Sequence, residues 1–283
     1  MLFLPRFVTG QCQYIAFGLT LWLSITGCRA MFGSTSEVKV VNGVLAQSSD
    51  AVARSTVGLI WSKNNNGSNG CSGTLVGKRV VLTAAHCFTA VGPVEQLQVT
   101  FGLQRGGAAT TLIAAKSYHT FEMPLDRGND HENLKNDPDR DDVAVVILAA
   151  DAPESYHSVP IAANTAAIGV GSTITIAGFG LTGADNLDSG TLRRADVVLS
   201  SIDKDDRSLH FSEDADRITY KGMCFGDSGG PAYLVKDGQM LLIGVARSTD
   251  LTCRERSIYT DIRPFSSWVN ERVAAALYKD GTD

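Results

Sequence analysis

The 283-residue chain lacks the marks of several large functional classes. Its N-terminal apolar run, residues 14–25, is shorter than the roughly 20 residues that a permanent transmembrane helix needs. Lys and Arg form no dense cluster, and the formal net charge of -5 argues against a nucleic-acid partner. No two cysteines have the C-x2-C spacing of a zinc site, so we expect neither a metal nor another cofactor.

The N-terminus has the pattern of an export signal. Arg6 precedes the apolar run, which ends in small residues, so we interpret residues 1–30 as a signal and the protein as secreted or periplasmic. The site of cleavage has two interpretations. Residues 25–28 resemble a bacterial lipobox, in which Cys28 becomes lipidated and anchors the protein. Alternatively, Cys28-Arg29-Ala30 is an ordinary signal-peptidase site before Met31.

The cysteine count indicates disulfides. Cys12 and Cys28 lie within or beside the signal, which leaves four cysteines for the mature protein: Cys71, Cys87, Cys224 and Cys253. An even number in an exported chain is typical of disulfide bonding, and four cysteines allow three pairings that the sequence cannot separate.

Most of the remaining chain consists of short β-rich runs separated by Gly, Asn, Asp and Ser. Val, Ile, Thr and aromatic residues dominate these runs, which indicates an all-β sandwich or barrel. Only residues 263–279 have helical periodicity, with one apolar face that we expect to pack on the β core. The predicted strands are 56–61, 79–83, 96–101, 142–148, 172–177, 195–200, 240–246 and 257–262.

Two segments between the predicted strands are interpreted as loops. Residues 64–70 are rich in Asn and Gly and form a turn before Cys71. Residues 126–141 mix acids and bases without the ligand pattern of a calcium loop, so we expect a solvated insertion. The boundary between two halves of similar size is expected near residues 151–158.

The segment from Gly226 to Pro231, Gly-Asp-Ser-Gly-Gly-Pro, is the strongest chemical signal. Small residues on both sides of Ser228 leave its hydroxyl accessible and allow backbone N–H groups to approach a substrate carbonyl. A glycine-rich turn with an incidental serine remains an alternative for this segment taken alone.

Two further residues supply the chemistry that such a serine needs. His86 follows an apolar strand and precedes Cys87, which can fix the backbone that carries a general base. Asp142 begins a buried strand, Asp142–Leu148. Its neighbour Asp141 is a rival for the acidic role.

In this order, His, Asp and Ser resemble the chymotrypsin/trypsin family of serine proteases. The resemblance covers about residue 40 to the C-terminus and includes three more segments, Val40–Gly43, Ala177–Gly180 and Ile258–Thr260. The chain is identified as a member of this family, secreted and of the bacterial type.

The resemblance implies an all-β fold of two six-stranded antiparallel β-barrels followed by a C-terminal helix. It also implies two disulfides, Cys71 to Cys87 and Cys224 to Cys253. The implied ranges are a propeptide at 31–39 and a peptidase domain at 40–283, with an N-terminal barrel at about 40–155, a C-terminal barrel at about 156–262 and the helix at about 263–279.

The same resemblance implies catalytic roles. Ser228 would attack the scissile carbonyl, His86 would accept and return its proton, and Asp142 would orient the imidazole. The backbone N–H groups of Gly226 and Ser228 would form the oxyanion hole.

The specificity pocket implied by the resemblance contains no acid. Gly222 occupies the floor position, and Met223, Thr249 and Ser257 occupy the walls, so we expect small or medium apolar side chains before the scissile bond. Asp250 could approach the mouth of the pocket and keeps a basic preference open.

One strand departs from the family pattern. Arg247 stands where the family has a serine that supports the triad aspartate, and Ser248 replaces the aromatic residue that follows. Either the alignment of this strand is shifted or the substrate contacts there are unusual.

The function implied by the family is that of a secreted serine endopeptidase made as a zymogen and cleaved after Lys39 by another protease. The new N-terminus at Val40 would pair with Asp227, which we expect to turn away before cleavage. The implied partners are protein or peptide substrates and an activating protease, and we expect a monomer. The alternative is an inactive, protease-like binding protein.

Overall fold

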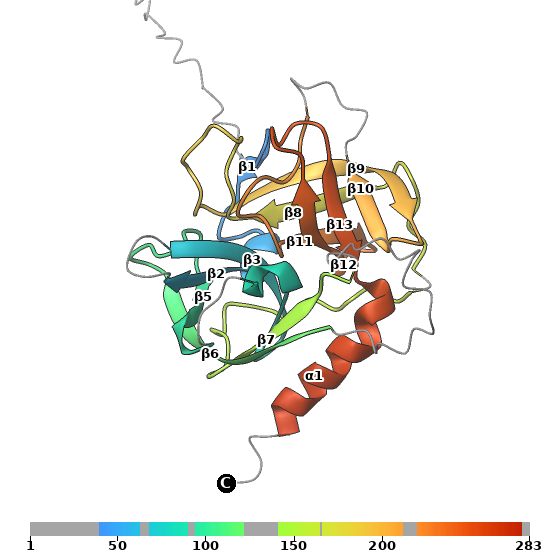
Figure 1. Ribbon diagram of the computed structural model, residues 1–283. Helices are drawn as coiled ribbons and strands as arrows, with labels where there is room; N and C mark the ends of the chain where they lie inside the picture. The colour runs from blue at the N-terminus through green and yellow to red at the C-terminus, as the bar shows by residue number, and fades with distance from the viewer. Residues whose placement is uncertain are drawn as a thin grey trace, which may run out of the picture. The chain divides into compact units, whose positions relative to one another are not determined.

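The computed structural model of the chain describes residues 40–62, 68–89, 94–121, 141–164, 166–211 and 220–278 (Figure 1). The chain divides into two compact units, and all described residues belong to the unit that spans residues 37–283. The predictions for the export signal, Cys28, the propeptide and Lys39 lie outside the described residues. So does the predicted insertion up to residue 140.

Six strands form a closed antiparallel barrel in the first half of the chain. Around the barrel they pair in the order β2-β3-β4-β7-β6-β5, and β5 pairs again with β2. Fully buried apolar side chains fill it, because alternate residues of each strand point inward. The strands are β2 (Thr56–Ser62), β3 (Ser68–Gly77), β4 (Val80–Thr83), β5 (Leu97–Phe101), β6 (Thr111–Thr120) and β7 (Ala144–Leu148).

A second set of six antiparallel strands closes in the same way. These strands pair in the order β9-β10-β13-β12-β11-β8, and β8 pairs with β9 to close the barrel. The short strand β1 (Val44–Leu45) adds to β9 from outside, so the start of the described chain belongs to this barrel. The strands are β8 (Thr173–Gly178), β9 (Arg193–Asp203), β10 (Ser208–Phe211), β11 (Pro231–Lys236), β12 (Gln239–Thr249) and β13 (Ser257–Asp261).

Buried contacts join the two barrels. The hydroxyl of Tyr233 on β11 is fully buried and hydrogen-bonds to Ser55 Oγ at 3.0 Å and Thr56 Oγ1 at 3.2 Å. Apolar residues of both barrels also belong to one hydrophobic cluster, which includes Leu75 of the first barrel and Val245 of the second. The barrels are therefore fixed against each other by packing and by hydrogen bonds.

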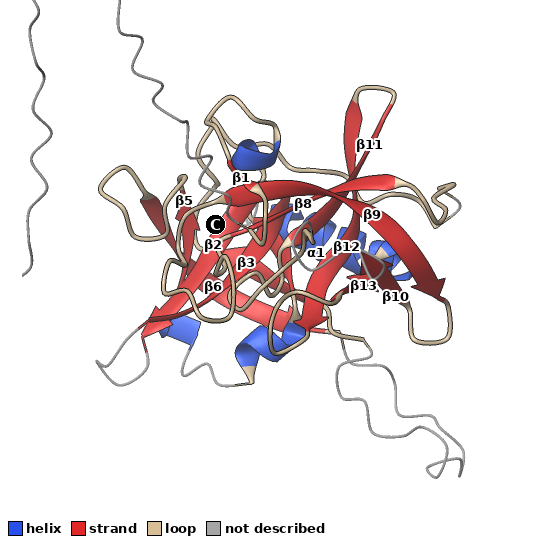
Figure 2. Ribbon diagram, turned by 90° about the horizontal axis from the view of Figure 1, so that it is seen from above, coloured by secondary structure: helices blue, strands red, loops and turns tan. Residues whose placement is uncertain are grey.

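The helix α1 (Ser266–Tyr278) returns the end of the chain to the first barrel. Its residue Val269 is fully buried in the shared cluster, and the helix contacts β4 and β7. Figure 2 shows that strands dominate and that the helical segments are few and short. The remaining ones are 3-10 turns, η1 (Val52–Arg54), η2 (Ala85–Phe88), η3 (Val94–Gln96) and η4 (Arg263–Phe265).

The predicted fold class is confirmed, since the structure has two closed six-stranded antiparallel barrels and a C-terminal helix. Five strands were not predicted, namely β1, β3, β6, β10 and β11. The strand β3 begins Ser-Asn-Gly within the segment interpreted as a turn, and β11 begins with Pro231. Pairing with neighbouring strands overrides these weak local preferences. Among the described residues no helix combines the length and apolar character needed to cross a bilayer.

Candidate active site

His86 and Asp142 lie in direct contact. His86 belongs to η2, which follows β4, and Asp142 precedes β7, the strand paired with β4. The Nδ1 atom of His86 lies 2.6 Å from Asp142 Oδ2, and the His86 backbone N–H donates to Asp142 Oδ1 at 2.7 Å. A carboxylate only accepts hydrogen bonds, so Nδ1 carries the proton and Nε2 is left as a base. Asp142 is 1% exposed, whereas the His86 side chain is 30% exposed.

The rival carboxylate Asp141 faces elsewhere. Its Oδ1 atom pairs with the guanidinium of Arg207 in the turn between β9 and β10. Arg247 is likewise occupied, because its Nη2 atom lies 2.6 Å from Asp206 Oδ2. The register of β12 and β13 shifts beside Arg247, so the departure from the family pattern coincides with a β-bulge.

Ser228 lies in a tight turn that contacts β3 and the segment carrying His86. Its carbonyl accepts a hydrogen bond from the backbone N–H of Ser72 at 2.8 Å. The next residue, Gly229, has φ +79°, and a Cβ there would lie 3.0 Å from the backbone nitrogen of Ala84. Because Ala84 is two residues before His86, the turn packs directly against the segment that carries the histidine.

The turn leaves two backbone N–H groups available. Within the described part of the chain, neither Gly226 nor Ser228 donates its amide to a protein acceptor. The carbonyl of Phe225 accepts from Leu181 N–H at 2.9 Å. Since a trans peptide directs C=O and N–H to opposite sides, the Gly226 N–H points away from Leu181.

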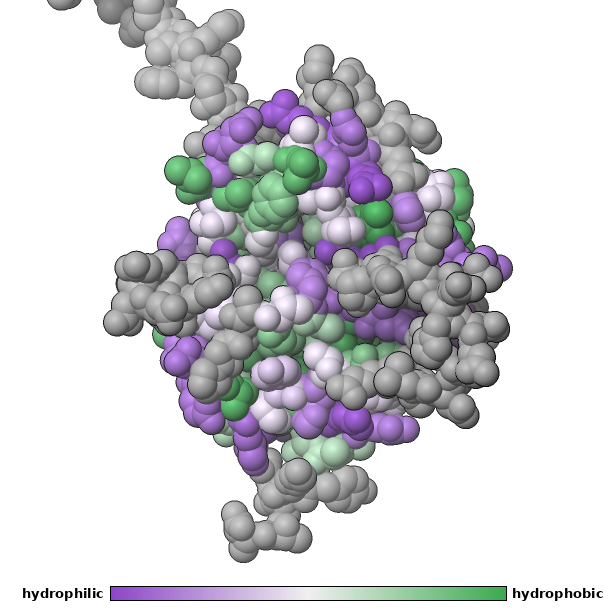
Figure 3. Space-filling model, in the orientation of Figure 1, coloured by the Kyte–Doolittle hydropathy of each residue, from purple (hydrophilic) through white to green (hydrophobic). Residues whose placement is uncertain are grey.

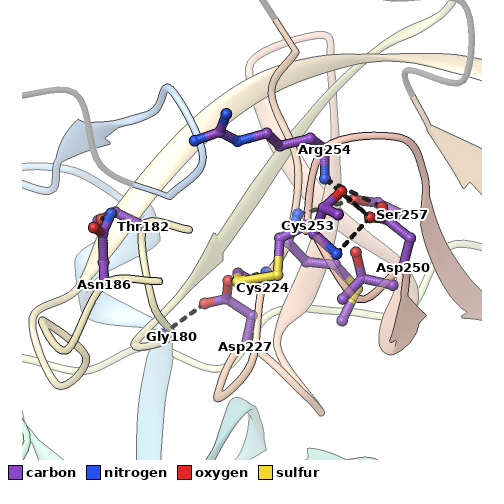
Figure 4. Close-up of a disulfide and its surroundings, with 12 residues drawn as sticks. Gly180, Thr182, Asn186, Cys224, Asp227, Asp250, Cys253, Arg254 and Ser257 are labelled. Atoms are coloured by element: carbon purple, nitrogen blue, oxygen red, sulfur yellow. Dashed lines mark hydrogen bonds between the residues drawn. A yellow bond between two sulfur atoms is a disulfide. The ribbon is translucent and has the colours of Figure 1, made fainter. Parts of the chain in front are cut away.

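Asp227 is buried behind this turn. Its carboxylate accepts the backbone N–H of Gly180 at 2.7 Å and that of Cys224 at 2.8 Å (Figure 4). Burial raises the pKa of Asp227 to about 6, although these two hydrogen bonds and the nearby Arg105 and Arg193 act to lower it. Asp227 is 2% exposed and its carboxylate faces inward, and its movement before cleavage stays a prediction.

Both disulfides implied by the family resemblance are present. Cys71 on β3 is bonded to Cys87 beside His86, and Cys224 is bonded to Cys253 next to Asp227 (Figure 4). Cys71, His86 and Cys87 lie close enough together to suggest a metal site. The two sulfur atoms are bonded to each other, however, and cannot act as thiolate ligands.

The four predicted pocket residues lie together, and a further residue, Tyr220, contacts two of them. Ser257 Oγ accepts the backbone N–H of Met223 at 2.9 Å and hydrogen-bonds to the hydroxyl of Tyr220 at 2.8 Å. A Cβ on Gly222 would overlap that hydroxyl and would lie 2.5 Å from Ser257 Oγ. Thr249 pairs with Ser257 across β12 and β13. Tyr220 is fully buried in contact with both Gly222 and Ser257.

Met223 differs from the expectation in its packing. Its side chain is 2% exposed and belongs to the hydrophobic cluster inside the second barrel. It therefore contributes to the barrel core as well as to the pocket region through its backbone.

The carboxylate of Asp250 is committed to its own loop. It accepts backbone N–H groups from the residues that follow, including Thr252 at 2.8 Å and Glu255 at 2.8 Å (Figure 4). Burial acts to raise the pKa of Asp250, but its hydrogen bonds, led by the Thr252 hydroxyl, lower it below the ordinary value. A basic substrate side chain would have to compete with these donors, so a basic preference based on Asp250 loses its support.

Sequence reasoning missed three residues that shape the site. The hydroxyl of Ser72 donates to the Gly226 carbonyl at 3.1 Å and accepts the Phe179 N–H at 3.0 Å, which ties the turn to both barrels. Tyr220 and Arg105 are the other two. No local pattern marks any of them, because their neighbours at the site are distant in sequence.

Comparisons with known proteins agree with this geometry. The profile of the Trypsin family matches residues 42–269. Trypsin alpha-4 of Lucilia cuprina is 27% identical over 74% of this chain and 79% of its own length. Serine protease SP24D of Anopheles gambiae is 30% identical over 70% of both chains, and Brachyurin of Leptuca pugilator is 28% identical over 57% of this chain and 69% of its own. These relatives are animal proteins and give no support to a bacterial-type member.

The raised pKa of Asp227 predicts how stability depends on pH. The folded-state pKa of about 6 exceeds the ordinary value of 3.8, so the folded intact chain binds this proton more tightly than the unfolded chain. The resulting stabilisation is present below pH about 4 and is lost as the pH rises through about 6, a change of about 3 kcal/mol.

Urea unfolding at a series of pH values measures this change. Asp227→Asn should be less stable than the wild type at pH 4, because its amide nitrogen cannot accept one of the two N–H groups, but it should lack the fall between pH 4 and 6. Asp205→Asn, at an exposed position, is the matched control and should retain the fall. Identical pH profiles for the wild type and Asp227→Asn would contradict the assignment.

Proposed function

Because the chain belongs to the trypsin family of serine proteases, we propose that it is a serine endopeptidase that hydrolyses peptide bonds through an acyl-enzyme on Ser228. The observation that carries the proposal is the pair of bonds from His86 to the buried Asp142, at 2.6 and 2.7 Å. This pair fixes the imidazole and leaves Nε2 as the base. The proposed triad is therefore His86, Asp142 and Ser228.

The proposed reaction begins when Ser228 Oγ attacks the scissile carbonyl carbon. His86 Nε2 takes the hydroxyl proton and then gives it to the leaving amine, while Asp142 stabilises the imidazolium. Water then enters and is activated by the same imidazole, which releases the acid product and restores the Ser228 hydroxyl.

The backbone N–H groups of Gly226 and Ser228 form the proposed oxyanion hole. Neither donates to a protein acceptor in the described part of the chain, so both are free to receive the negative oxygen. Each such donor is worth about 3 kcal/mol of transition-state stabilisation.

A catalytically inactive, protease-like binding protein is the alternative function. The free oxyanion donors and the oriented His86 favour the enzyme, because a binding protein has no need to keep them together. The two functions differ in whether Ser228 reacts as a nucleophile.

A labelled fluorophosphonate should react with the mature wild type and abolish its peptidase activity, because the reagent bonds to an activated serine. Ser228→Ala should show no labelling and at most about 10^-3 of the wild-type kcat, since only binding and the oxyanion donors remain. Its unfolding midpoint should match the wild type, because the half-buried hydroxyl contributes little to packing. Peptidase activity of Ser228→Ala near the wild-type level would exclude this nucleophile.

We also propose a preference for small apolar residues before the scissile bond. The hydrogen-bonded Tyr220 and Ser257 occupy the deep part of the pocket, and Gly222 supplies no acid. Large or basic side chains would therefore clash or remain unpaired.

A peptide library should be cut after Ala, Val or Thr in preference to Lys or Arg. Tyr220→Ala should increase the relative kcat/KM for Leu and Phe at this position, because it removes the phenol that closes the floor. Cleavage by the wild type mainly after Arg would overturn the pocket assignment.

We further propose that the protein is exported as a zymogen and activated by cleavage between Lys39 and Val40. Val40 has φ +55°, a left-handed conformation that is strained for a β-branched residue, and it is buried in the cluster of the second barrel. Val41 pairs with Gly222 at the pocket floor. Cleavage would free the strained backbone and create an ammonium group in this buried region.

The new N-terminal ammonium would pair with the carboxylate of Asp227. The pKa of about 6 indicates that the surrounding hydrogen bonds and arginines do not offset the burial of its carboxylate. A cation delivered by cleavage would favour the ionised form and so stabilise the turn that carries Gly226 and Ser228. We propose activation by a protease with basic specificity, because the pocket described above does not suit Lys39.

Treatment of the purified precursor with trypsin should produce a Val40 N-terminus and a rise in peptidase activity. Lys39→Gln should remain folded with little activity after the same treatment, whereas Lys204→Gln, in an exposed turn, should be activated normally. Intact mass and an activity assay measure both outcomes. Rapid maturation of the isolated precursor, second order in its own concentration, would contradict activation by a different protease.

The proposed location is extracellular or periplasmic, with a lipid anchor at Cys28 as the alternative. We propose a monomer that acts on proteins or peptides and does not bind nucleic acid. Figure 3 shows hydrophilic and apolar residues on the visible part of one face, with apolar residues gathered at its upper left.

A further inference from the structure

An arginine from the first barrel reaches the proposed oxyanion turn. Arg105 follows β5, and its backbone N–H donates to the Gly190 carbonyl of the second barrel at 2.6 Å. The neighbouring residues Gln104 and Thr191 form a β-bridge. The backbone of Arg105 is therefore held between the two barrels.

Two glycines make room for its side chain. The stem passes over Gly58 on β2, where a Cβ would lie 3.2 Å from Arg105 Cδ. The guanidinium passes over Gly70 on β3, where a Cβ would overlap it. The Nη2 atom then lies 3.9 Å from the point that a Cβ of Gly226 would occupy. The side chain is thus directed along a glycine-lined slot toward the turn.

The guanidinium retains hydrogen-bonding capacity. Its Nη1 atom donates a long hydrogen bond to the Cys71 carbonyl at 3.4 Å. Among the residues that the structure describes, Nε and Nη2 have no protein acceptor, and neither is among the buried atoms without a partner, so both reach solvent. Burial of the stem lowers the pKa of Arg105 while Asp227 raises it, and an arginine remains charged at any physiological pH. A carboxylate ligand would satisfy this partly desolvated cation.

The position of the guanidinium identifies the part of the substrate that it faces. The pocket of Gly222 and Ser257 belongs to the second barrel, whereas Arg105 approaches Gly226 from the first barrel beside Cys71. If the scissile carbonyl lies at the Gly226 N–H with its acyl side chain in the pocket, the leaving peptide runs toward Cys71. Residues advance by about 3.3–3.6 Å along an extended chain, so the first two leaving-group residues pass the guanidinium.

We propose that Arg105 forms a subsite for a carboxylate in the first two residues after the scissile bond, which makes the enzyme favour acidic leaving peptides. This inference rests on the proposed endopeptidase function. The carboxylate can come from an Asp or Glu side chain or from a free C-terminus at the second position.

The test uses mature enzyme and peptides that share one acyl half ending in Val. Amidated peptides carry Ala-Ala, Asp-Ala, Ala-Asp or Ala-Lys after the scissile bond, and a second pair ends in Ala-Ala with a free or an amidated C-terminus. The measured quantity is the ratio of kcat/KM between a peptide with the extra carboxylate and its neutral partner. If a variant of Arg105 changes activity through the nearby Asp227, it changes kcat/KM for both peptides alike, and the ratio is unaffected.

We expect a ratio of about ten for at least one carboxylate position, because a charge-assisted hydrogen bond at a partly exposed site discriminates by about that factor. The ratio should fall toward one in Arg105→Gln, remain intermediate in Arg105→Lys, and decrease as salt is raised. Arg272→Gln removes one positive charge on α1 and should keep the wild-type ratio. An effect in the Asp-containing peptides would indicate a side-chain carboxylate, and an effect in the pair with free and amidated ends would indicate a C-terminal carboxylate.

A ratio near one in the wild type, or an unchanged ratio in Arg105→Gln, would overturn the subsite while leaving the endopeptidase intact. Absence of all cleavage together with absence of fluorophosphonate labelling would instead overturn the proposed function, and the subsite with it.

Discussion

The arrangement around Ser228 depends on the burial of one carboxylate. Asp227 is 2% exposed, so its charge must be met by protein groups rather than by water. The N–H groups of Gly180 and Cys224 donate hydrogen bonds to this carboxylate, and they come from two loops far apart in sequence. By binding both loops, Asp227 anchors the turn that carries the N–H groups of Gly226 and Ser228. The chemistry proposed for Ser228 therefore depends on an interaction made by its neighbour.

Close packing around this carboxylate explains the concentration of glycine there. A Cβ on Gly178 or Gly180 would overlap the Asp227 side chain, and one on Gly230 would lie 2.6 Å from the Ala177 carbonyl. Gly226 and Gly229 also have φ of +95° and +79°, values that favour glycine. The glycines of the motif thus have two separate causes, a positive φ at some positions and the absence of space at others.

Features formed by contiguous residues could be predicted from the sequence. Features formed by residues distant in sequence could not. The His86 and Ser228 segments, the C-terminal helix and eight strands could be predicted because each has a local pattern. The strand β3 could not, since its Ser-Asn-Gly start resembles a turn and only pairing with β2 makes it a strand. Tyr220 was missed because it acts through a hydrogen bond to Ser257, 37 residues later. Arg105 was missed because its side chain is positioned by glycines of other strands.

The small pocket proposed at Gly222 and Ser257 would limit how this protein selects substrates. A small apolar pocket discriminates weakly, because each methylene that it accepts or rejects changes the transition-state energy by about 1–3 kcal/mol. In the proposed pocket the hydroxyl pair of Tyr220 and Ser257 would leave little depth, so the residue before the scissile bond would contribute little binding energy. Selectivity beyond this must come from contacts further along the substrate. The cation with spare hydrogen-bonding capacity beside the Gly226 turn is Arg105, since Arg247 is buried and paired with Asp206. The proposed Arg105 subsite would therefore make substrate charge, more than side-chain size at the proposed pocket, the basis of selectivity.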